Sequence, residues 1–398
     1  MLDLSKLTHQ MRGISQYLAE ESTAARKRLE RAQILFEAAT GEQQALSQAQ
    51  QDWAHRLIFT CATPVEPLTL RQAIAEAPTA HTVIATDGSQ IAPSHHEIAY
   101  CYLINVGRTV LHYGQSRYPL LDSLPEVVYR PEDLYQSHQW GIRTDEWMGH
   151  RRTVSEAVVL GELVCDLVAA GPLTHPTLAM VDGSLVYWFL DTLPEAAQHE
   201  LLPAILAAWD QLRDRGVPVV GYISATRSSE SLNFLRLHSC PHEEPDCQRH
   251  CAKPAATNAR PPCHVFAPLR DAALWGQLLQ PGQRSPLWRA GAAILERYGD
   301  HHIYFCYLHV GSEVARLEMP AWVTNDPELL DWALTLTMAQ VQKGLGYPVA
   351  LAESHNQAVV RGGDRLRFFG LLEREMVRAG LRNIGTSYKE ARKRGSIA

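Results

Sequence analysis

Two apolar runs in the sequence end in the same three residues, Asp-Gly-Ser. Residues 82–90 read TVIATDGSQ, and residues 178–185 read LAMVDGSL. Asp-Gly is a common turn signal, because Asp supports a tight turn and Gly tolerates positive φ. Both runs are too apolar for surface hairpins, so we expect two buried strands that end in Asp87 and Asp182.

The order of the predicted elements around these runs indicates the fold class. Gly107-Arg108 is interpreted as a hairpin between two strands, and Thr144 as the N-cap of a long helix. The predicted order is strands over 82–89, 97–107 and 109–118, an irregular segment over 119–143, a helix over 144–171, a strand over 178–185, a helix over 194–216 and a strand over 217–225. This is the order of a ribonuclease-H-like α/β domain, a mixed sheet with flanking helices. In that topology the strands of Asp87 and Asp182 are neighbours, which predicts that the two carboxylates face each other.

Composition and chain order divide the sequence into four segments. They are a helical N-terminal region (1–75), a ribonuclease-H-like core (76–235), a Cys-rich insertion (236–268) and a C-terminal part that completes the site (269–398). Apolar residues recur at helical spacing over 1–60, and no proline precedes Pro64. We therefore expect one or two long helices, an arm that packs on its own domain rather than a coiled coil with a partner.

The bulk composition is that of a soluble globular protein. Apolar residues make up 46% and charged residues 20% of 398 residues, and no apolar run is long enough to cross a bilayer. The first residues include an early acid and no apolar h-region, so a secretory signal is not expected. We expect a cytoplasmic protein with reduced or metal-bound thiols. The net charge of −6 argues against a broad basic surface that coats duplex DNA, but it permits a local basic groove.

Two facing aspartates are a typical site for a divalent cation. Their charges repel, a cation removes the conflict, and hard oxygen ligands suit Mg²⁺ or Mn²⁺. Such an ion can hold a phosphodiester and activate water. A third acid is expected from the helix before Asp182, where Glu156 and Glu162 are the alternatives and helical periodicity does not choose between them. Glu156 is preferred because it follows Arg151-Arg152, which are candidates for phosphate contact.

Further candidates lie downstream. Tyr347 and His355 flank a short apolar stretch, close in sequence to Arg361 and Arg365. Histidine binds Mn²⁺ and serves as a general acid or base near neutral pH, although a lone histidine is more often structural. Arg227 follows the last predicted strand and is a candidate DNA contact, with an ordinary polar loop as the alternative. The segment over 311–323 is interpreted as an edge strand pair with a salt-bridged surface.

The Cys-rich insertion carries four of the eight cysteines within 24 residues: Cys240, Cys247, Cys251 and Cys263. Its proline-rich, apolar-poor sequence cannot build a core of its own, so cross-linking by a metal is a physically reasonable interpretation. Structural Zn²⁺ is the first hypothesis and an iron–sulfur cluster the second. Free thiols in a loop are the alternative.

Together, the two Asp-Gly-Ser segments and GYPVALAESH (346–355) resemble the NurA-type nucleases, DNA-end-processing enzymes with a ribonuclease-H-like core. The resemblance runs from about residue 80 to residue 365. The metal-site pattern of that family, Asp, Glu, Asp, Tyr and His, falls on Asp87, Glu156 or Glu162, Asp182, Tyr347 and His355. The resemblance implies Mn²⁺-dependent cleavage of single-stranded DNA, 5′-to-3′ resection of DNA ends in break repair, a homodimer, and work with a HerA-type hexameric ATPase.

The interpretation is therefore a metal-dependent nuclease. We expect Asp87, Asp182 and a helical Glu as metal ligands, His355 as a further ligand or acid/base, and Tyr347 as a phosphate- or water-orienting group. One alternative is a non-catalytic scaffold of a DNA-repair complex. The other is an actin/hexokinase-like ATPase, which shares the core topology but uses Asp-x-Gly loops and a Gly-rich adenosine loop.

Overall fold

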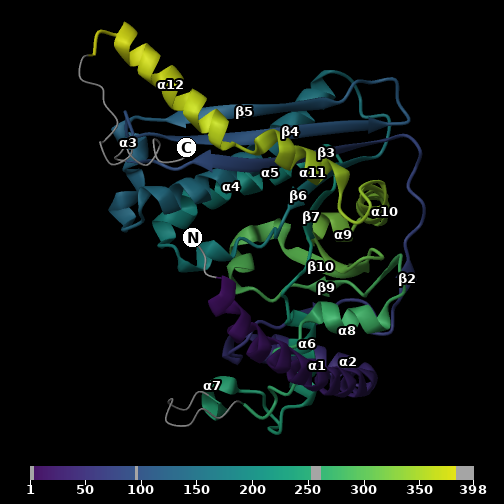
Figure 1. Cartoon of the computed structure of the whole chain (residues 1–398). Helices are drawn as coiled ribbons and strands as arrows, with labels where there is room; N and C mark the ends of the chain where they lie inside the picture. Colours follow the sequence, from purple (N-terminus) through teal and green to yellow (C-terminus); the bar gives the residue numbers. More distant parts are fainter. Residues whose placement is uncertain (1–3, 95–96, 252–260, 382–398) are drawn as a thin grey trace. The chain divides into compact units, whose positions relative to one another are not determined.

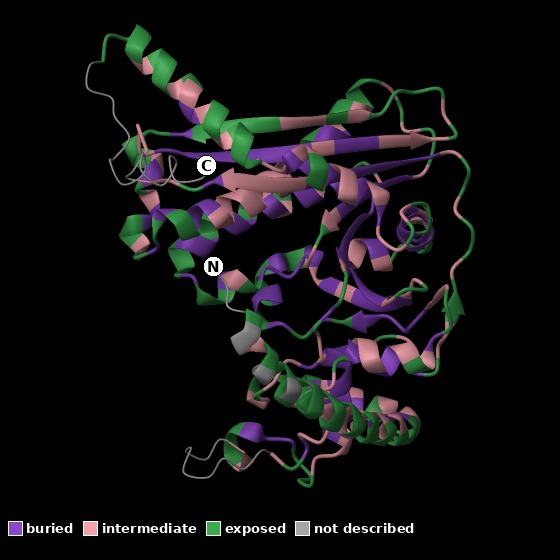
Figure 2. Cartoon of the chain, viewed as in Figure 1, coloured by how far each residue is buried: buried purple, intermediate pink, exposed green. Residues whose placement is uncertain are grey.

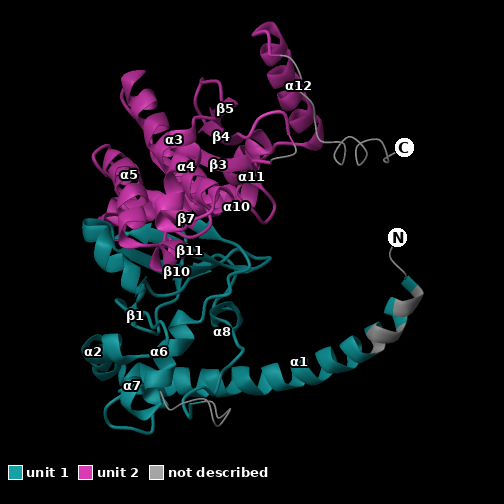
Figure 3. Ribbon diagram, turned by 90° about the vertical axis from the view of Figure 1, so that its left-hand side faces the viewer, with its two compact units in different colours: residues 1–75, 222–321 teal, residues 76–221, 322–398 magenta. Residues whose placement is uncertain are grey.

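The computed structural model describes residues 4–94, 97–251 and 261–381 (Figure 1). The chain divides into two compact units, the first formed by residues 1–75 and 222–321, the second by residues 76–221 and 322–398 (Figure 3). The segments predicted over 1–75 and 236–268 fall in the first unit. Those predicted over 76–235 and 269–398 are divided between the two units.

The second unit is built on a mixed sheet. Its strands are β3 (His81–Ile91), β4 (Tyr102–Tyr113), β5 (Leu120–Val128), β6 (Thr177–Asp182) and β7 (Val219–Ile223), the last of which begins in this unit. The strand order is β7-β6-β3-β4-β5, with β3 parallel to β6 and antiparallel to β4, and β4 antiparallel to β5. This is the ribonuclease-H-like order, so the predicted fold class is confirmed.

Two details of the predicted meander are wrong. β4 runs straight through Gly107-Arg108, where a hairpin was expected, and Gly107 is paired with Asp87 in the middle of the ladder. Glycine stands there because a helix backbone packs against it, not because the chain turns. The segment 120–128, expected to be irregular, forms the edge strand β5, where Pro125 is tolerated because an edge strand leaves some N–H groups unpaired.

Helices cover both faces of this sheet. The elements are α3 (Pro131–Leu134), η2 (Gln136–Trp140), α4 (Thr144–Ala169), η3 (Trp188–Thr192), α5 (Glu195–Arg213), α10 (Pro327–Lys343), α11 (Val349–Ala358) and α12 (Gly362–Arg378), with α9 (Ala321–Thr324) at the unit boundary. The N-cap of α4 is Arg143 rather than Thr144, whose hydroxyl donates instead to the Leu134 carbonyl at 3.0 Å. No helix among the described residues is both long and apolar enough to cross a membrane.

Alternation along β4 assigns the two faces. Tyr102, Ile104 and Val106 pack with Met148 and Val159 of α4. Successive strand residues point to opposite faces, so the odd-numbered residues face the other way. There Leu103 and Ile91 pack against Phe369 of α12. The middle of the sheet is buried between these layers (Figure 2).

The first unit combines the N-terminal helices with a small antiparallel sheet. Its elements are α1 (Leu4–Gly41), α2 (Gln43–Trp53), η1 (Ala54–Arg56), β1 (Thr63–Pro64), β2 (Gln72–Ala73), α6 (Glu230–His238), α7 (Cys247–His250), α8 (Asp271–Leu278), β8 (Gln283–Arg284), β9 (Trp288–Arg289), η4 (Ala293–His301), β10 (Ile303–His309) and β11 (Val314–Pro320). One or two N-terminal helices were predicted, and two are present, α1 and α2. Only the later part of α1 packs as expected, with Phe36 edge-on to Trp275, whereas Met11, Ile14 and Leu18 are exposed.

A buried ion network replaces the salt-bridged surface that the sequence suggested on β11. Arg316 is 2% exposed, and its guanidinium contacts Glu230 and Glu318, each at 2.8 Å. Asp271 lies in the same interior, where it accepts hydrogen bonds from the N–H groups of Ser231 and Leu232 and so caps α6. The predicted surface is therefore wrong: β11 has an entirely buried pattern.

Replacing the central cation of this network should destabilise the first unit. In Arg316→Met the carboxylates of Glu230 and Glu318 remain buried without their partner, and we expect a loss of about 3–5 kcal/mol. Arg289→Met, at an exposed arginine of the same unit, should change the free energy of unfolding by less than about 0.5 kcal/mol. Urea unfolding followed by circular dichroism measures both variants. Equal effects would contradict the network's role.

Gly107→Ala tests the packing of α11 on β4. A Cβ at Gly107 would lie 2.3 Å from the Ser354 carbonyl oxygen and 2.4 Å from the Ala358 nitrogen, both backbone atoms of α11. We expect a loss of about 1–3 kcal/mol. Gly149→Ala in α4, where a Cβ would meet nothing within 4 Å, should be neutral or slightly stabilising. Thermal unfolding of the pair measures the contrast, and an unaffected Gly107→Ala would rule out close packing.

Candidate active site

The two aspartates lie on adjacent strands, as predicted. β3 and β6 are parallel, and Thr86 pairs with Val181. Asp87 and Asp182 each follow this pair by one residue, so they lie at adjacent positions of the two strands. The two Asp-Gly-Ser segments nevertheless differ in conformation. The first continues as extended strand, with Gly88 paired to Val106, whereas the second leaves the sheet in a turn at Gly183 with φ of +116°. The common residue that matters for the site is therefore the aspartate.

Glu156 on α4 reaches the same place. The Thr86 hydroxyl donates to the Glu156 carbonyl at 2.9 Å, which holds this turn of α4 against β3. A Cβ at Gly88 would lie 2.3 Å from Oε1 of Glu156, so only glycine allows the carboxylate this close to the strand. Glu162 is instead exposed. Its negative charge adds slightly to the raised pKa of Arg108, which comes chiefly from the bidentate hydrogen bonds with Asp122. Of the two glutamates left open by the sequence, Glu156 is the one beside the aspartates.

His355 comes from the opposite face of the sheet, on α11. Its Nδ1 lies 2.7 Å from Oδ2 of Asp87, whose Oδ1 accepts from the Gly88 N–H at 2.8 Å. The end of α11 is fixed through the Ala358 carbonyl, which accepts hydrogen bonds from the Asn105 amide at 2.7 Å and from the Ser89 hydroxyl. His355 is 63% exposed on its side chain, so one edge of the site is open to solvent.

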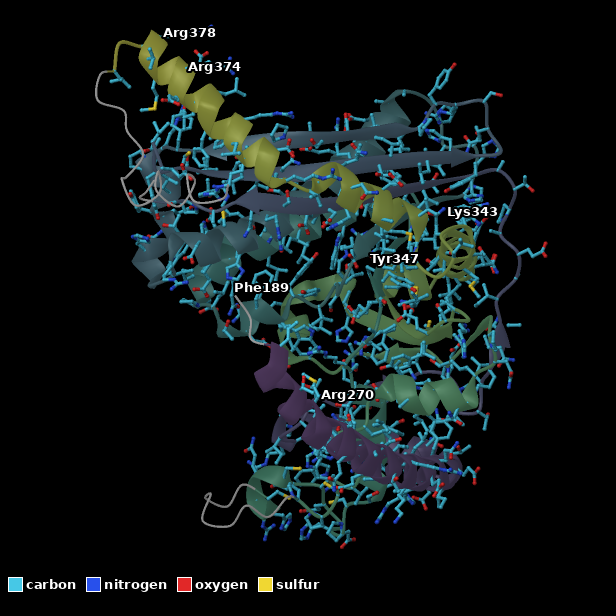
Figure 4. The ribbon with its side chains drawn as sticks, in the orientation of Figure 1. Phe189, Arg270, Lys343, Tyr347, Arg374 and Arg378 are labelled. Atoms are coloured by element: carbon cyan, nitrogen blue, oxygen red, sulfur yellow. The ribbon has the colours of Figure 1, made fainter. Side chains whose placement is uncertain are left out.

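Tyr347 lies in the connection between α10 and α11 (Figure 4). Its hydroxyl donates a hydrogen bond to the Asp182 carboxylate. Gln340, a buried residue of α10, fixes the start of α11 because its Oε1 accepts a hydrogen bond from the Ala350 N–H at 3.0 Å. Tyr347 and His355 thus reach the aspartates from two ends of one short segment.

The electrostatics of the site reflect crowded carboxylates. Burial, together with the negative charges of Asp87 and Asp182, raises the pKa of the Glu156 carboxyl to about 7, although Arg152 at 3.3 Å opposes the shift. Burial also raises the pKa of Asp182, and Asp87 adds to the rise, while the hydrogen bond from Tyr347 opposes it. A bound cation would relieve this repulsion.

Oxygen donors dominate the site, which fits a hard divalent cation, and one imidazole is compatible with Mn²⁺. Within the described ranges, no three His, Cys, Asp or Glu side chains already form a closed group of metal ligands. The contact between Asp87 and His355 instead pairs two of the predicted ligands with each other.

The predicted DNA contacts are scattered. Arg152 lies beside Glu156, and Arg151 lies 3.8 Å from Glu126 of β5. Arg365 contacts Glu97 at 3.1 Å, and Arg361 is the exposed N-cap residue of α12. Arg227 belongs to the first unit, as do Cys240, Cys247, Cys251 and Cys263.

Sequence reasoning missed the residues that position the site: Thr86, Ser89, Asn105 and Gln340. One signal was available for Asn105, a polar residue inside the apolar run YLINV, because a buried amide requires a hydrogen-bond partner. Gln340 carried no comparable signal, since polar residues are common on helices.

The NurA domain family model matches residues 81–360, about 70% of the chain, and this range includes all five residues of the predicted metal-site pattern. The chain belongs to the NurA family. The resemblance seen in the Asp-Gly-Ser segments and in residues 346–355 is thus confirmed.

Two solved structures are similar to this NurA-family chain. The NurA nuclease from Sulfolobus solfataricus is 11% identical, with a TM-score of 0.48 over 95% of this chain and 98% of that one. LC9-RNase H1, a type 1 RNase H with the type 2 active-site motif, is 12% identical, with a TM-score of 0.21 over 41% of this chain and 72% of that one. No curated protein matches the sequence.

The raised pKa of Glu156 predicts a pH dependence for the metal-free protein. The folded-state pKa of about 7 lies above the ordinary 4.5, so the native state binds this proton more tightly than the unfolded chain. Relative to Glu156→Gln, the wild type should lose stability as pH rises from 4.5 to about 7, by on the order of 2–3 kcal/mol in total. Thermal unfolding in EDTA across this range measures the difference.

The matched control is Glu162→Gln on the same helix. The difference in stability between this variant and the wild type should not change in this way with pH. Adding Mn²⁺ above pH 7 should stabilise the wild type more than Glu156→Gln, because ligand binding to the native state raises its stability. A pH-independent difference between wild type and Glu156→Gln would contradict the coupling of the three acids.

Proposed function

We propose that this chain is a metal-dependent nuclease that cleaves DNA phosphodiesters. The observation that carries the proposal is the convergence of Asp87, Glu156 and Asp182 from separate elements on one place, with Tyr347 and His355 beside them. Membership of the NurA family supports the same reaction class, and the name of the similar Sulfolobus protein, a nuclease, agrees with it.

The donor set suits Mn²⁺ or Mg²⁺. Asp87, Glu156 and Asp182 would hold the ion, with His355 as a further ligand or as an acid/base. When bound, a divalent cation binds the phosphate, lowers the pKa of a water molecule and stabilises the leaving oxygen. The raised pKa values of Glu156 and Asp182 are those expected of acids that share a cation site.

The chain's own groups would complete the site. With Nδ1 of His355 directed to Asp87, its Nε2 is the nitrogen left for ligation or proton transfer. Tyr347, bound to Asp182, is placed to orient water or a phosphate oxygen. Arg152 holds a guanidinium next to Glu156, where it can contact the DNA backbone as well as the acid.

We further propose 5′-to-3′ processing of DNA ends in break repair, with both exo- and endonuclease cleavage, as a homodimer that works in the cytoplasm with a HerA-type hexameric ATPase. These details rest on the family resemblance. Basic side chains of α12, Arg374 and Arg378 among them (Figure 4), follow Arg361 and Arg365 along the chain and offer a local phosphate-binding surface despite the net charge of −6.

The test is cleavage of end-labelled single- and double-stranded DNA with Mn²⁺, Mg²⁺ or EDTA. We expect metal-dependent cleavage by the wild type that falls by more than about 100-fold in Asp87→Asn, Asp182→Asn and Glu156→Gln, because each loses a metal ligand. Glu162→Gln is the matched control and should stay within about 2-fold of the wild type. Labels on either DNA end report polarity, and addition of the hexameric ATPase reports partner dependence.

Cleavage by the variants at the wild-type rate would overturn this site. A folded wild type that binds Mn²⁺ but cleaves no DNA, alone or with the ATPase, would favour the scaffold. ATP hydrolysis by the isolated protein, without DNA cleavage, would favour the ATPase.

A further inference from the structure

The four cysteines of the insertion line one small cavity in the first unit. Cys240, Cys247, Cys251 and Cys263 surround it with His242 and His250, whose rings are stacked 4.0 Å apart. The cavity has a volume of about 10 Å³, room for one water-sized particle. Each thiol is free of disulfide bonds. None of these residues belongs to the proposed nuclease site, which lies in the second unit.

The thiols are close enough to influence one another. Burial raises the pKa of the Cys251 thiol, and the neighbouring Cys240, Cys247 and Cys263 add to the rise, Cys247 also through a hydrogen bond. Burial likewise raises the pKa of Cys240, with smaller contributions from Cys247 and Cys263. Cys247 and Cys263 are buried, and the other two are half-buried. Four thiols that converge from positions spread over 24 residues are not ordinary core cysteines.

A buried cation lies directly beside these sulfurs. Arg236 of α6 is 7% exposed, and its Nη2 donates to Sγ of Cys263 at 3.6 Å. Its other partners among the described residues are the Asn233 amide oxygen at 3.3 Å and the face of the Phe59 ring at 3.6 Å, both uncharged. A guanidinium buried against neutral groups carries a large desolvation cost, which a negatively charged metal–thiolate centre at this place would offset.

Polar contacts hold the chain on one side of the cavity. Asp246 caps the four-residue helix α7 and receives a bidentate contact from Arg56, at 2.6 and 3.0 Å. Gln248 adds a further contact to Arg56. These bonds fix the start of α7, where Cys247 lies.

We propose that Cys240, Cys247, Cys251 and Cys263 form a structural Zn²⁺ site. Four thiolates suit tetrahedral zinc, the ion would occupy the single-particle cavity, and Arg236 would offset part of the net negative charge of a four-thiolate centre. In the described part of the chain the four sulfurs do not yet form a closed ligand group, so side-chain rotations must bring them together around the ion. Bound zinc would cross-link the turns of chain that carry these four cysteines.

The experiment measures metal content in the full-length protein, purified under reducing conditions without chelator. We expect about one zinc per chain in the wild type and less than about a fifth of that in Cys247→Ser and Cys251→Ser. Cys165→Ser, at a half-buried thiol in the second unit that contacts Gln211, is the matched control and should keep its zinc. Asp182→Asn should also keep it, which separates this site from the nuclease site.

A serine variant that fails to fold would also lose zinc, so a second measurement uses the wild type alone. Exchange of zinc for Co²⁺ should give the intense visible bands of tetrahedral thiolate coordination, and the metal should protect these four thiols from alkylation. A wild type without zinc and without the Co²⁺–thiolate bands would overturn the proposal. So would iron with acid-labile sulfide, or zinc that is retained by Cys247→Ser and lost in Asp182→Asn.

Discussion

The close approach of two helices to neighbouring strands at Gly88 and Gly107 is the constraint on which the second unit depends. At Gly88 the missing side chain admits the Glu156 carboxylate from the α4 side, and at Gly107 it admits the backbone of α11 from the other side. Because Gly107 is paired with Asp87, α11 is forced to pass over the strand position that carries an acid. The proposed ligands from opposite faces can therefore meet beside Asp87, where the neighbouring strand β6 ends at Asp182.

The same packing creates an electrostatic problem inside the site. Glu156 is brought out of water beside Asp87 and Asp182, and its pKa rises to about 7. Local contacts offset only part of this cost, through Arg152, the Tyr347 hydroxyl and the imidazole of His355. Electrostatic repulsion between buried acids is typical of functional sites, where a bound ligand supplies the missing stabilisation. The first unit resolves a similar conflict internally, since Arg316 lies between two buried glutamates.

Much of this arrangement was predictable from the sequence. The fold class and the neighbouring positions of Asp87 and Asp182 followed from the order of the predicted strands and helices, although the bounds of β4 and the strand β5 were missed. Tyr347 and His355 were selected by resemblance, and the structure brings them beside the aspartates. The hairpin at Gly107 was wrong because local turn chemistry was outweighed by the packing of α11, which is remote in sequence. The buried Arg316 network was missed because an alternating charged strand is indistinguishable from a solvated edge until its neighbours are known.

The sequence by itself identified the candidate residues: paired aspartates on buried strands, a histidine and a tyrosine downstream, and four clustered cysteines. Hydrophobic periodicity and residue type are local properties, so they can be recognised in a short window of the sequence. Only the tertiary structure decided between Glu156 and Glu162, because both lie on one apolar helix and the choice depends on which turn meets Gly88. It also decided that Arg236 lies against Cys263. Contacts between residues far apart in sequence are set by the packing of whole elements, which no short window of sequence contains.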